Sequence, residues 1–406
     1  MPFLLAMALL APGVAQSGID GDAEEATIRP ASAEFRPDDD PFAFRIHPAL
    51  AVLPDHGEVL VWDTGSNVFG RRYREGKPLG PIFQVNAFVP GSSFQTDPSV
   101  CSFPDGHFVV AWAINVHGVG LAPRMVAARF FARNGEPLSP NLQVSTGDRE
   151  EGAPRIACGE RSAFVVWAGA DGDGQGVVGR LLLGDGSAMG KEIGINSFEQ
   201  GTQSAPAVAA AGDGGFIVAW QSFWQEVEWD VFARRIDRQG RVAGPETRIN
   251  GDVAGSQEEP GLAVADSGEI VVVWTDWNNG KSGVRARAVS ADGQPFGSDV
   301  QVNAVAAGRQ VFASVAALSG GRFVVIWQRE FLKEDSSNVL LRLLRWPELA
   351  AGAELVANSY LPGRQDAPAI SSDGALRFSS AWQSGQQAGQ SYGVYGREFE
   401  VAIEPH

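Results

Sequence analysis

Two stretches near the middle of the chain combine tryptophan with acidic and amide side chains. The segment 222–230, Ser-Phe-Trp-Gln-Glu-Val-Glu-Trp-Asp, is followed by a second at 276–279, Asp-Trp-Asn-Asn. Aromatic rings stack on the C–H faces of sugars, while neighbouring carboxylates and amides bond the hydroxyls. The pattern predicts a sugar-binding surface, although the same rings could instead pack under long loops or plug a channel mouth. The candidate residues are Trp224, Trp229, Trp277, Glu226, Glu228, Asp230 and Asp276.

A second short segment has the alternating acidic positions of a calcium loop. In Asp171-Gly-Asp-Gly-Gln-Gly176, Asp171 and Asp173 are spaced like the first ligands of such a loop. However, Gln175 stands where Asp or Asn is expected, and Leu182 cannot supply the bidentate carboxylate of the twelfth position. We therefore expect no required cofactor. Calcium at Asp171 and Asp173 is the one candidate, and a solvated Gly-Asp turn is the simpler interpretation.

Catalytic motifs are almost absent from the sequence. The five histidines show no metal-ligand spacing, and there is no Gly-x-Ser-x-Gly nucleophile elbow. Pairs of loop carboxylates could serve glycoside cleavage, but nothing in the sequence selects one pair. We therefore expect a binding protein more readily than an enzyme.

The charge balance argues against two classes of partner. Lys and Arg together number 32 and Asp and Glu 48, which gives a formal net charge of −16. Nucleic acids and anionic membranes are bound through clustered cations, so we expect neither. No apolar run beyond the N-terminus approaches the length of a membrane span.

The N-terminus has the form of an export signal. Residues 1–15 are uncharged and contain an apolar run that ends in Gly13-Val-Ala15, although no Lys or Arg precedes the run. This predicts a cleaved signal peptide and a secreted, cell-surface or periplasmic protein, which we expect to be a monomer. Residues 16–40 are rich in Asp, Glu, Ala and Pro and are predicted to form a disordered acidic lead-in. A single domain is expected over 41–406.

That domain consists of repeated copies of one pattern. Each copy has an apolar strand that ends in tryptophan, and successive tryptophans lie 50 to 55 residues apart. A proline-led strand comes before this strand in most copies, and a strand of the form Val-x-x-Arg comes after it. Such a period indicates a repeat architecture. The tryptophans are Trp62, Trp112, Trp167, Trp220, Trp274, Trp327 and Trp382.

The repeated strand is apolar at consecutive positions, so both of its faces must be buried. Four-stranded units of about fifty residues that stack through both faces are blades of a β-propeller. The sequence therefore predicts an all-β, seven-bladed β-propeller. Because the last copy lacks a fourth strand, we expect 33–36 or 42–46 to complete it and to close the ring with strands from both chain ends.

The copy around Trp220 shows the full pattern. It contains Gly-Gly-Phe-Ile-Val-Ala-Trp at 214–220, Val-Phe-Ala-Arg-Arg at 231–235 and Arg-Ile-Asn at 248–250. In tandem from about residue 48 to 400, this pattern resembles the repeats of secreted bacterial proteins that include large calcium-binding surface adhesins. The resemblance implies a propeller on an exported protein, with binding or adhesion more usual than catalysis.

Residues kept in every copy have a simpler explanation than ligand binding. We expect each repeat Trp and Arg to hold its unit to the next, since Trp offers a large apolar contact and Arg can bond turn carbonyls. Cys101 and Cys158 lie in the first strands of neighbouring copies. Export would permit a disulfide, but its geometric window is narrow, and we expect two free buried thiols.

The function that follows from these features is a secreted binding or adhesion module that recognises a glycan or glycoprotein on its loop face. The alternative is a polysaccharide-active enzyme, a lyase or hydrolase, on the same scaffold. A third class is a scaffold that binds an extracellular protein.

Overall fold

The computed structural model of the protein describes residues 25–37, 44–87, 93–116, 124–146, 152–171, 174–186, 190–224, 228–387 and 392–404. Regular structure in these ranges is all β-strand. None of the described residues belongs to a helix that could cross a membrane. The prediction of an all-β fold is confirmed.

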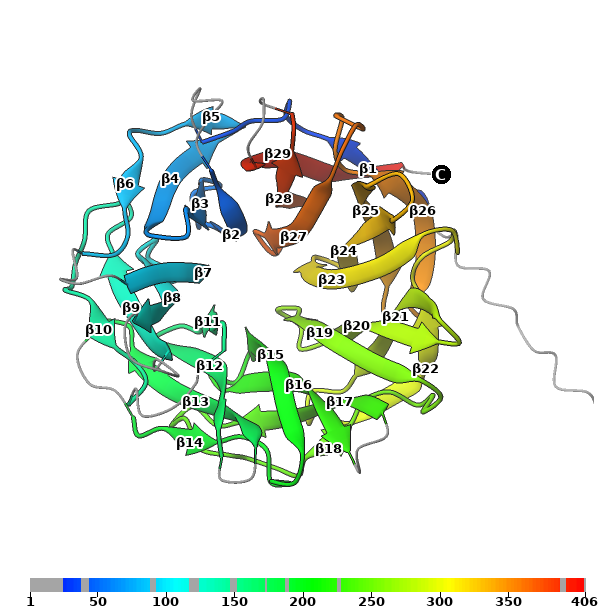
Figure 1. The fold of residues 1–406 in the computed structure, drawn as a ribbon, viewed down its shortest axis with the longest axis horizontal. Helices are drawn as coiled ribbons and strands as arrows, with labels where there is room; N and C mark the ends of the chain where they lie inside the picture. Colours follow the sequence, from blue (N-terminus) through cyan, green and yellow to red (C-terminus); the bar gives the residue numbers. More distant parts are fainter. Residues whose placement is uncertain are drawn as a thin grey trace, which may run out of the picture.

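The strands form six sheets that stand side by side round a common axis (Figure 1). Five sheets are single groups of consecutively antiparallel strands. The eight-stranded sheet contains two such groups, joined by one parallel pair between Gln175 and Thr202. The groups are β2 (Ile46–Val52), β3 (Glu58–Asp63), β4 (Val68–Arg74), β5 (Lys77–Pro78) and β6 (Phe83–Gln84); β7 (Ser93–Ser102), β8 (Phe108–Val116), β9 (Arg124–Phe131) and β10 (Leu142–Gln143); β11 (Arg155–Cys158), β12 (Ser162–Ala170), β13 (Gln175–Leu183) and β14 (Ile193–Gly194); β15 (Thr202–Ala210), β16 (Phe216–Trp224), β17 (Glu228–Ile236) and β18 (Thr247–Arg248); β19 (Ser256–Val264), β20 (Ile270–Asn278), β21 (Lys281–Val289) and β22 (Pro295–Gln301); β23 (Arg309–Leu318), β24 (Arg322–Phe331), β25 (Ser336–Arg345) and β26 (Ala350–Val356); and β27 (Gln365–Ser372), β28 (Arg377–Gly385) and β29 (Tyr392–Glu404) with β1 (Glu25–Pro30).

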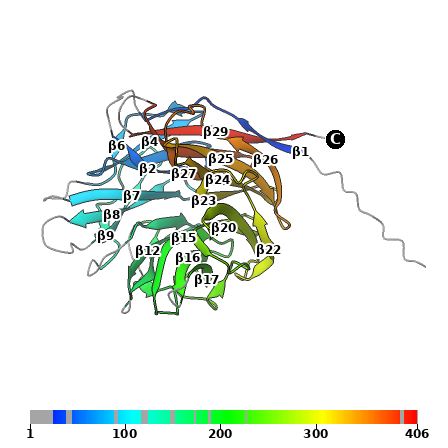
Figure 2. The same cartoon turned by 45° about the vertical axis from the view of Figure 1, so that its right-hand side comes forward.

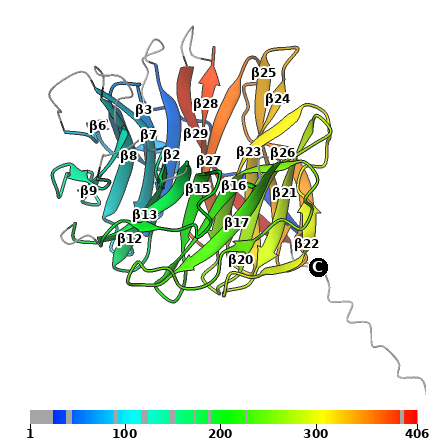
Figure 3. The ribbon, with the colours of Figure 1, turned by 60° about the horizontal axis from the view of Figure 1, so that its bottom comes forward.

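The first strand of each group lies nearest the axis, and the loops gather on two opposite faces (Figure 3). We call one of them the mouth face; it carries the connections after the second strands, such as 64–67, 279–280 and 332–335. The opposite turn face carries the tight turns that join the first and second strands, such as 53–57. Each inner strand therefore begins at the mouth face and ends at the turn face.

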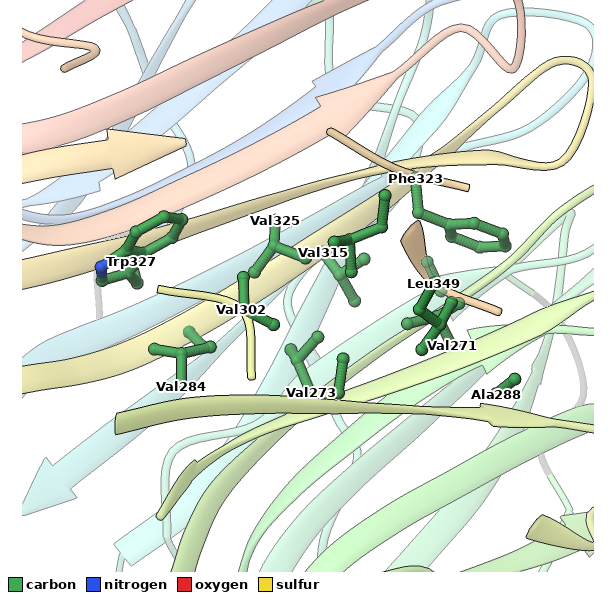
Figure 4. Packing of buried hydrophobic residues seen from close by; sticks show 14 of the residues in the cluster. Val271, Val273, Val284, Ala288, Val302, Val315, Phe323, Val325, Trp327 and Leu349 are labelled. Carbon is green, nitrogen blue, oxygen red and sulfur yellow. The ribbon is translucent and has the colours of Figure 1, made fainter. Parts of the chain in front are cut away.

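The second strand of each group is buried on both faces, as the sequence predicts. All residues of β3 are buried, and every tryptophan that the repeat places on a second strand is at most 1% exposed. Figure 4 shows Val273 and Val284 of one group packing against Val325 and Trp327 of the next. Cutting such a buried Trp back to Ala would cost about 3–5 kcal/mol of stability.

The repeat arginines join neighbouring groups, as expected. Arg234 Nε donates to the carbonyl of Gly244 in its own group (2.9 Å), and its Nη1 donates to Ile195 in the preceding group (2.8 Å). In the first group, Arg71 Nη1 donates to the carbonyl of Pro37 in the N-terminal segment, which takes the place of a preceding group. The same two-sided arrangement recurs at Arg129, Arg180, Arg287, Arg342 and Arg397.

The N-terminal segment departs from the predicted disordered lead-in over 16–40. β1 pairs antiparallel with β29, from Glu25 opposite Glu404 to Pro30 opposite Phe399, and the two lie side by side in Figures 1 and 2. Ile28 joins the hydrophobic core there, and this burial explains why an acidic stretch is ordered. The strand is not 33–36 or 42–46, the two segments expected to supply it: the first contributes a single bridge, from Phe35 to Gly396, and Ile46 begins β2. The predicted signal peptide, 1–15, lies outside the described residues.

The prediction of two free thiols was wrong. Cys101 of β7 and Cys158 of β11 form a disulfide with their Cα atoms 5.5 Å apart. These strands are the inner strands of neighbouring groups and converge towards the axis. Their convergence brings the two cysteines within bonding distance, which spacing along the sequence could not reveal.

Candidate active site

A cavity of about 650 Å³ lies between the inner strands at the mouth face. We call it the mouth cavity. Its charged lining residues are His47, Asp97, Arg155 and Glu259. These four side chains come from four different groups of strands, and none of them belongs to the sugar-binding surface predicted from the sequence.

Most inner strands have a β-bulge where they line the cavity. Each bulge lies near the start of its strand, and the bulged residue has a left-handed backbone with φ between 48° and 56°. This conformation costs a residue other than glycine on the order of 1–3 kcal/mol unless its surroundings hold it. The residues in this position are His47, Asp97, Ala205, Glu259, Phe312 and Ala367.

Side chains from the neighbouring group hold several of these bulges. Gln221, directly after the repeat Trp220, accepts the backbone N–H of Glu259 at 2.7 Å. Each acceptor follows a repeat tryptophan, so the repeat places it on the second strand beside the next inner strand. We call this hydrogen bond the cross-tie. The other cross-ties run from Ala367 to Gln328 (3.1 Å), from His47 to Gln383 (3.3 Å) and from Asp97 to Asp63 (3.1 Å).

His47 forms a compact cluster with two carboxylates. Its Nδ1 lies 2.8 Å from Asp63 Oδ2 and 3.8 Å from Asp97 Oδ1. The Asp63 side chain is fully buried, whereas the His47 ring is 42% exposed towards the cavity. The hydrogen bond that His47 donates to Asp63 raises the pKa of His47, and the charge of Asp97 adds to this rise against the opposing effects of burial and Arg155. Because Nδ1 is engaged, Nε2 is the nitrogen that can meet a ligand.

Arg155 supplies a cation beside this cluster. It opens β11 and lines the same cavity, and its Nη1 donates to the carbonyl of Pro154 at 3.0 Å. Loss of hydration inside the protein lowers the pKa of its guanidinium, and the negative charge of Asp97 opposes that change. In the described part of the chain no carboxylate forms an ion pair with Arg155, so the guanidinium is available to an anionic group.

Glu259 is a carboxyl group of the mouth cavity with a raised pKa. Its Oε2 accepts the N–H of Phe312 (3.3 Å) and the hydroxyl of Thr275 (3.4 Å). Burial raises its pKa to about 7, and the negative charge of Glu258 contributes. A carboxyl group with such a pKa can donate a proton near neutrality.

Trp229 and Trp277 both lie beside Ser256 on the mouth face. Ser256 at the start of β19 stands opposite Trp277 in the ladder, and its hydroxyl accepts the backbone N–H of Trp229 at 3.3 Å. Trp229 packs against Phe223 with ring centroids 5.1 Å apart, and the guanidinium of Arg309 lies 4.7 Å from the centroid of Trp277. Two of the three predicted tryptophans therefore lie beside Ser256, and each ring already has a ring or cation neighbour.

The predicted acidic residues that the structure describes serve mainly to join strands. Asp276 is buried and accepts hydrogen bonds from Gln257 and Arg285, both at 3.2 Å. Asp230 accepts a hydrogen bond from the Asn250 amide at 2.6 Å. Because these carboxylates already have partners, a sugar hydroxyl would have to compete for them.

Three of the other predicted residues fall wholly or partly outside the described residues. Glu228 begins β17 opposite Trp224, but the side chain of Trp224, Glu226 and Asp173 are not described. Asp171 Oδ2 accepts a hydrogen bond from Asn196 at 3.3 Å. The described residues contain no group of three or more His, Cys, Asp or Glu that could hold a metal ion. Calcium at this loop remains a prediction.

Sequence reasoning missed the mouth cluster because its residues match no known motif. The mouth cluster comprises His47, Asp63, Asp97 and Arg155. His47 and Asp97 each precede the proline of an inner strand, Asp63 follows a repeat tryptophan, and Arg155 follows Pro154. The residue before the proline is alanine in several copies, such as Ala205 and Ala367, but it is His47, Asp97 or Glu259 in three others. Comparison of the copies position by position would have revealed this change.

Comparison with known proteins shows similarity only at the level of the fold. No protein-family model matches the sequence, and no curated protein matches it. The polysaccharide lyase Uly1 superimposes with a TM-score of 0.59 at 11% identity over 92% of this chain and 100% of that one. An α-L-arabinanase of Penicillium chrysogenum complexed with arabinobiose gives 0.55 at 13% identity over 80% and 100%. A protein of unknown function from Dyadobacter fermentans gives 0.58 at 13% over 92% and 99%.

These similarities correct two predictions. Solved structures that share the fold include a polysaccharide lyase and an arabinanase, whereas the sequence favoured a non-enzymatic binding or adhesion module. The expectation that the protein is not an enzyme is overturned in the same way. The resemblance to repeats of secreted adhesins stays a prediction, as do the monomeric state and the export of the chain.

Proposed function

We propose that the protein is a polysaccharide-active enzyme that cleaves chains containing uronic acid by β-elimination in the mouth cavity. One observation carries the proposal. His47, oriented by a buried carboxylate, lines the cavity together with Arg155, whose guanidinium has no described carboxylate partner. Elimination from a uronate needs these two functions, a cation on the sugar carboxylate and a base for the proton beside it.

The residues fit the steps of such a reaction. Arg155 would bind the uronate carboxylate and stabilise the negative charge that develops when the adjacent C5–H bond breaks. Nε2 of neutral His47 would take that proton, and the C–H electrons would form the C4–C5 double bond. The C4–O bond breaks as this double bond forms, its electrons leave with the oxygen, and the leaving oxygen needs a proton. Glu259 lines the same cavity, and its pKa of about 7 suits it as the donor.

The predicted tryptophans supply a surface for the rest of the polymer. Trp229 and Trp277 lie near the start of β19, three residues before Glu259. Rings in this position would stack on sugars that extend from the cavity over the mouth face. Their role would be to hold the polysaccharide, and Glu228 and Asp230, which flank Trp229 in the sequence, could bond its hydroxyls. The proposed reaction requires no cofactor.

The overall charge sets one condition on this substrate. A net charge of −16 repels a polyanion at long range, but salt at about 0.1 M screens exposed charges beyond roughly 10 Å. The attraction must therefore be local, and Arg155 provides it. Cleavage is expected to be slower at very low salt.

Hydrolysis is a second candidate, supported by Glu259. A carboxyl group with a pKa of about 7 can protonate a glycosidic oxygen, and Asp97 lines the same cavity as a second carboxylate. In that reaction water ends on the sugar and no double bond forms. The two reactions therefore differ in their products.

The scaffold in this proposal is a seven-bladed propeller closed by both ends of the chain. Counting the two groups of the eight-stranded sheet separately gives seven blades. The pairing of β1 with β29, the cross-tie from His47 to Gln383 and the bond from Arg71 to Pro37 support closure between the last and first blades. The disulfide suits an exported protein whose signal peptide is 1–15.

The test is digestion of a panel of polysaccharides by the mature chain. Polygalacturonate, alginate and glucuronoxylan represent the uronates, and arabinan and xylan the neutral polymers. Ultraviolet absorbance detects the unsaturated product of elimination, and a reducing-end assay detects every cleavage. We expect both signals on a uronate and the loss of both in Arg155→Gln, with the exposed Arg238→Gln as the matched control. Reducing ends without absorbance would support hydrolysis, and neither signal on any polymer would refute the proposal.

A further inference from the structure

One cross-tie differs from the others in charge. Gln221, Gln328 and Gln383 accept the backbone N–H of a bulged residue in the neighbouring group through a neutral amide. At the corresponding place in the first group stands Asp63, which accepts the N–H of Asp97 at 3.1 Å. Because neutral glutamine accepts the bulge N–H in three other places, that hydrogen bond alone does not explain why Asp63 carries a negative charge.

The additional contacts of Asp63 point to that explanation. Its Oδ2, besides holding Asp97, lies 2.8 Å from His47 Nδ1. Its Oδ1 accepts the N–H of Gly65 at 2.9 Å. The carboxylate thus bonds one ring and two backbone groups from a fully buried position, where water does not screen its charge.

We propose that Asp63 is a positioning residue for the mouth cavity, which fixes the tautomer of His47 and the location of Asp97 through one buried carboxylate. A carboxylate can only accept, so the His47 proton must sit on Nδ1 and the lone pair of Nε2 must face the cavity. An amide in its place could present its NH₂ to Nδ1 and reverse the tautomer. The proposal rests on the proposed function for its catalytic meaning, but the tautomer and charge of His47 can be measured without it.

The charged groups around His47 come from three neighbouring elements. Asp63 ends β3, Asp97 lies in the bulge of β7, and Arg155 opens β11. Asp63 and Asp97 raise the pKa of His47, and Arg155 lowers it. Removing the charge of Asp63 alone should therefore lower this pKa while Asp97 and Arg155 remain in place.

The experiment compares two variants of the full chain by NMR of the histidine rings. Asp63→Gln installs the side chain that three other cross-ties use, and Asp63→Asn removes the charge with little change in shape. His47→Gln assigns the signal among the five histidines. Gln328→Ala, which cuts a cross-tie at Ala367, serves as the matched control. We expect both Asp63 variants to fold, to lower the pKa of His47 and to change the ratio of its tautomers, and the control to change neither.

Activity adds a second readout where the wild type cleaves a polysaccharide. Both Asp63 variants should then lose about 10²-fold or more in kcat with a smaller change in KM, because the base is misoriented while the binding groups remain. A His47 titration and tautomer equal to wild type in folded Asp63→Asn would overturn the assignment of Asp63, whatever the activity. Absence of cleavage by the wild type would refute the proposed function and leave the NMR result to decide on Asp63.

Discussion

Glu58 gives the sharpest test of the electrostatics at the junction between the first and last groups of strands. It opens β3, is 4% exposed, and its Oε1 is buried without a hydrogen-bond partner among the described residues. Burial raises its pKa to about 8; a hydrogen bond from Ser379 opposes the rise, and Glu398 adds to it. Both neighbours belong to the last group. The two chain ends therefore meet at a carboxyl group that favours its protonated form.

The direction of the pH effect follows from these values. Below the ordinary pKa of 4.5, Glu58 is protonated in both the folded and the unfolded chain and costs nothing. As the pH rises, the unfolded chain releases this proton first, so the free energy of unfolding falls until about pH 8 and then levels off. At about 1.4 kcal/mol for each pH unit, the full loss is on the order of 5 kcal/mol.

Replacing Glu58 with Gln keeps the shape and removes the ionisation. We expect Glu58→Gln to match the wild type below the ordinary pKa of 4.5 and to exceed it by several kcal/mol near pH 9. Urea unfolding at a series of pH values measures the difference. The control is Glu75→Gln, an exposed carboxylate that lines the same cavity of about 380 Å³ at this junction. Parallel pH profiles for Glu58→Gln and the wild type would refute the reasoning.

Four further outcomes follow from the structure. The rate of cleavage should pass through a maximum near neutrality, because neutral His47, whose pKa is raised, is needed as the base and protonated Glu259, whose pKa is about 7, as the acid; a rate independent of pH over this range would contradict the assignment. Arg155→Lys should retain part of the activity that Arg155→Gln loses, since a point charge replaces a bidentate one, and steady-state kinetics measures both. Trp277→Ala should raise KM on long chains more than on short oligomers. Reduction of the Cys101–Cys158 disulfide, which closes a loop of 57 residues, should cost about 2–4 kcal/mol, seen as a lower melting temperature.

The scaffold was readable from the sequence because its determinants are local and repeated. The consecutive apolar positions before each tryptophan required burial on both faces, and the buried β3 shows it. The N-terminal strand was missed because its one core residue, Ile28, lies in a segment whose acidic composition indicates disorder. The partner that orders it is β29, more than 360 residues away along the chain. Composition cannot detect such pairing.

The mouth cluster was hidden for a different reason. His47, Asp97 and Arg155 lie on separate groups of strands, about fifty residues apart in sequence, and meet only because the inner strands converge on one axis. The left-handed bulge that carries His47 and Asp97 also follows no turn signal of glycine or asparagine. Trp229 and Trp277, by contrast, were conspicuous in the sequence, and both lie near the start of β19.

The cost of burying a charge makes Asp63 the most informative departure from the repeat. Removing a carboxylate from water costs several kcal/mol unless its partners replace the lost hydration, and a neutral glutamine forms the same cross-tie elsewhere without that cost. Asp63 recovers the cost through bonds to His47, Asp97 and Gly65. The bond to His47 is the one that an amide cannot reproduce with the same tautomer. A buried carboxylate, which costs more free energy than glutamine, therefore stands where His47 and Asp97 meet. Stability alone does not explain why aspartate occupies this position.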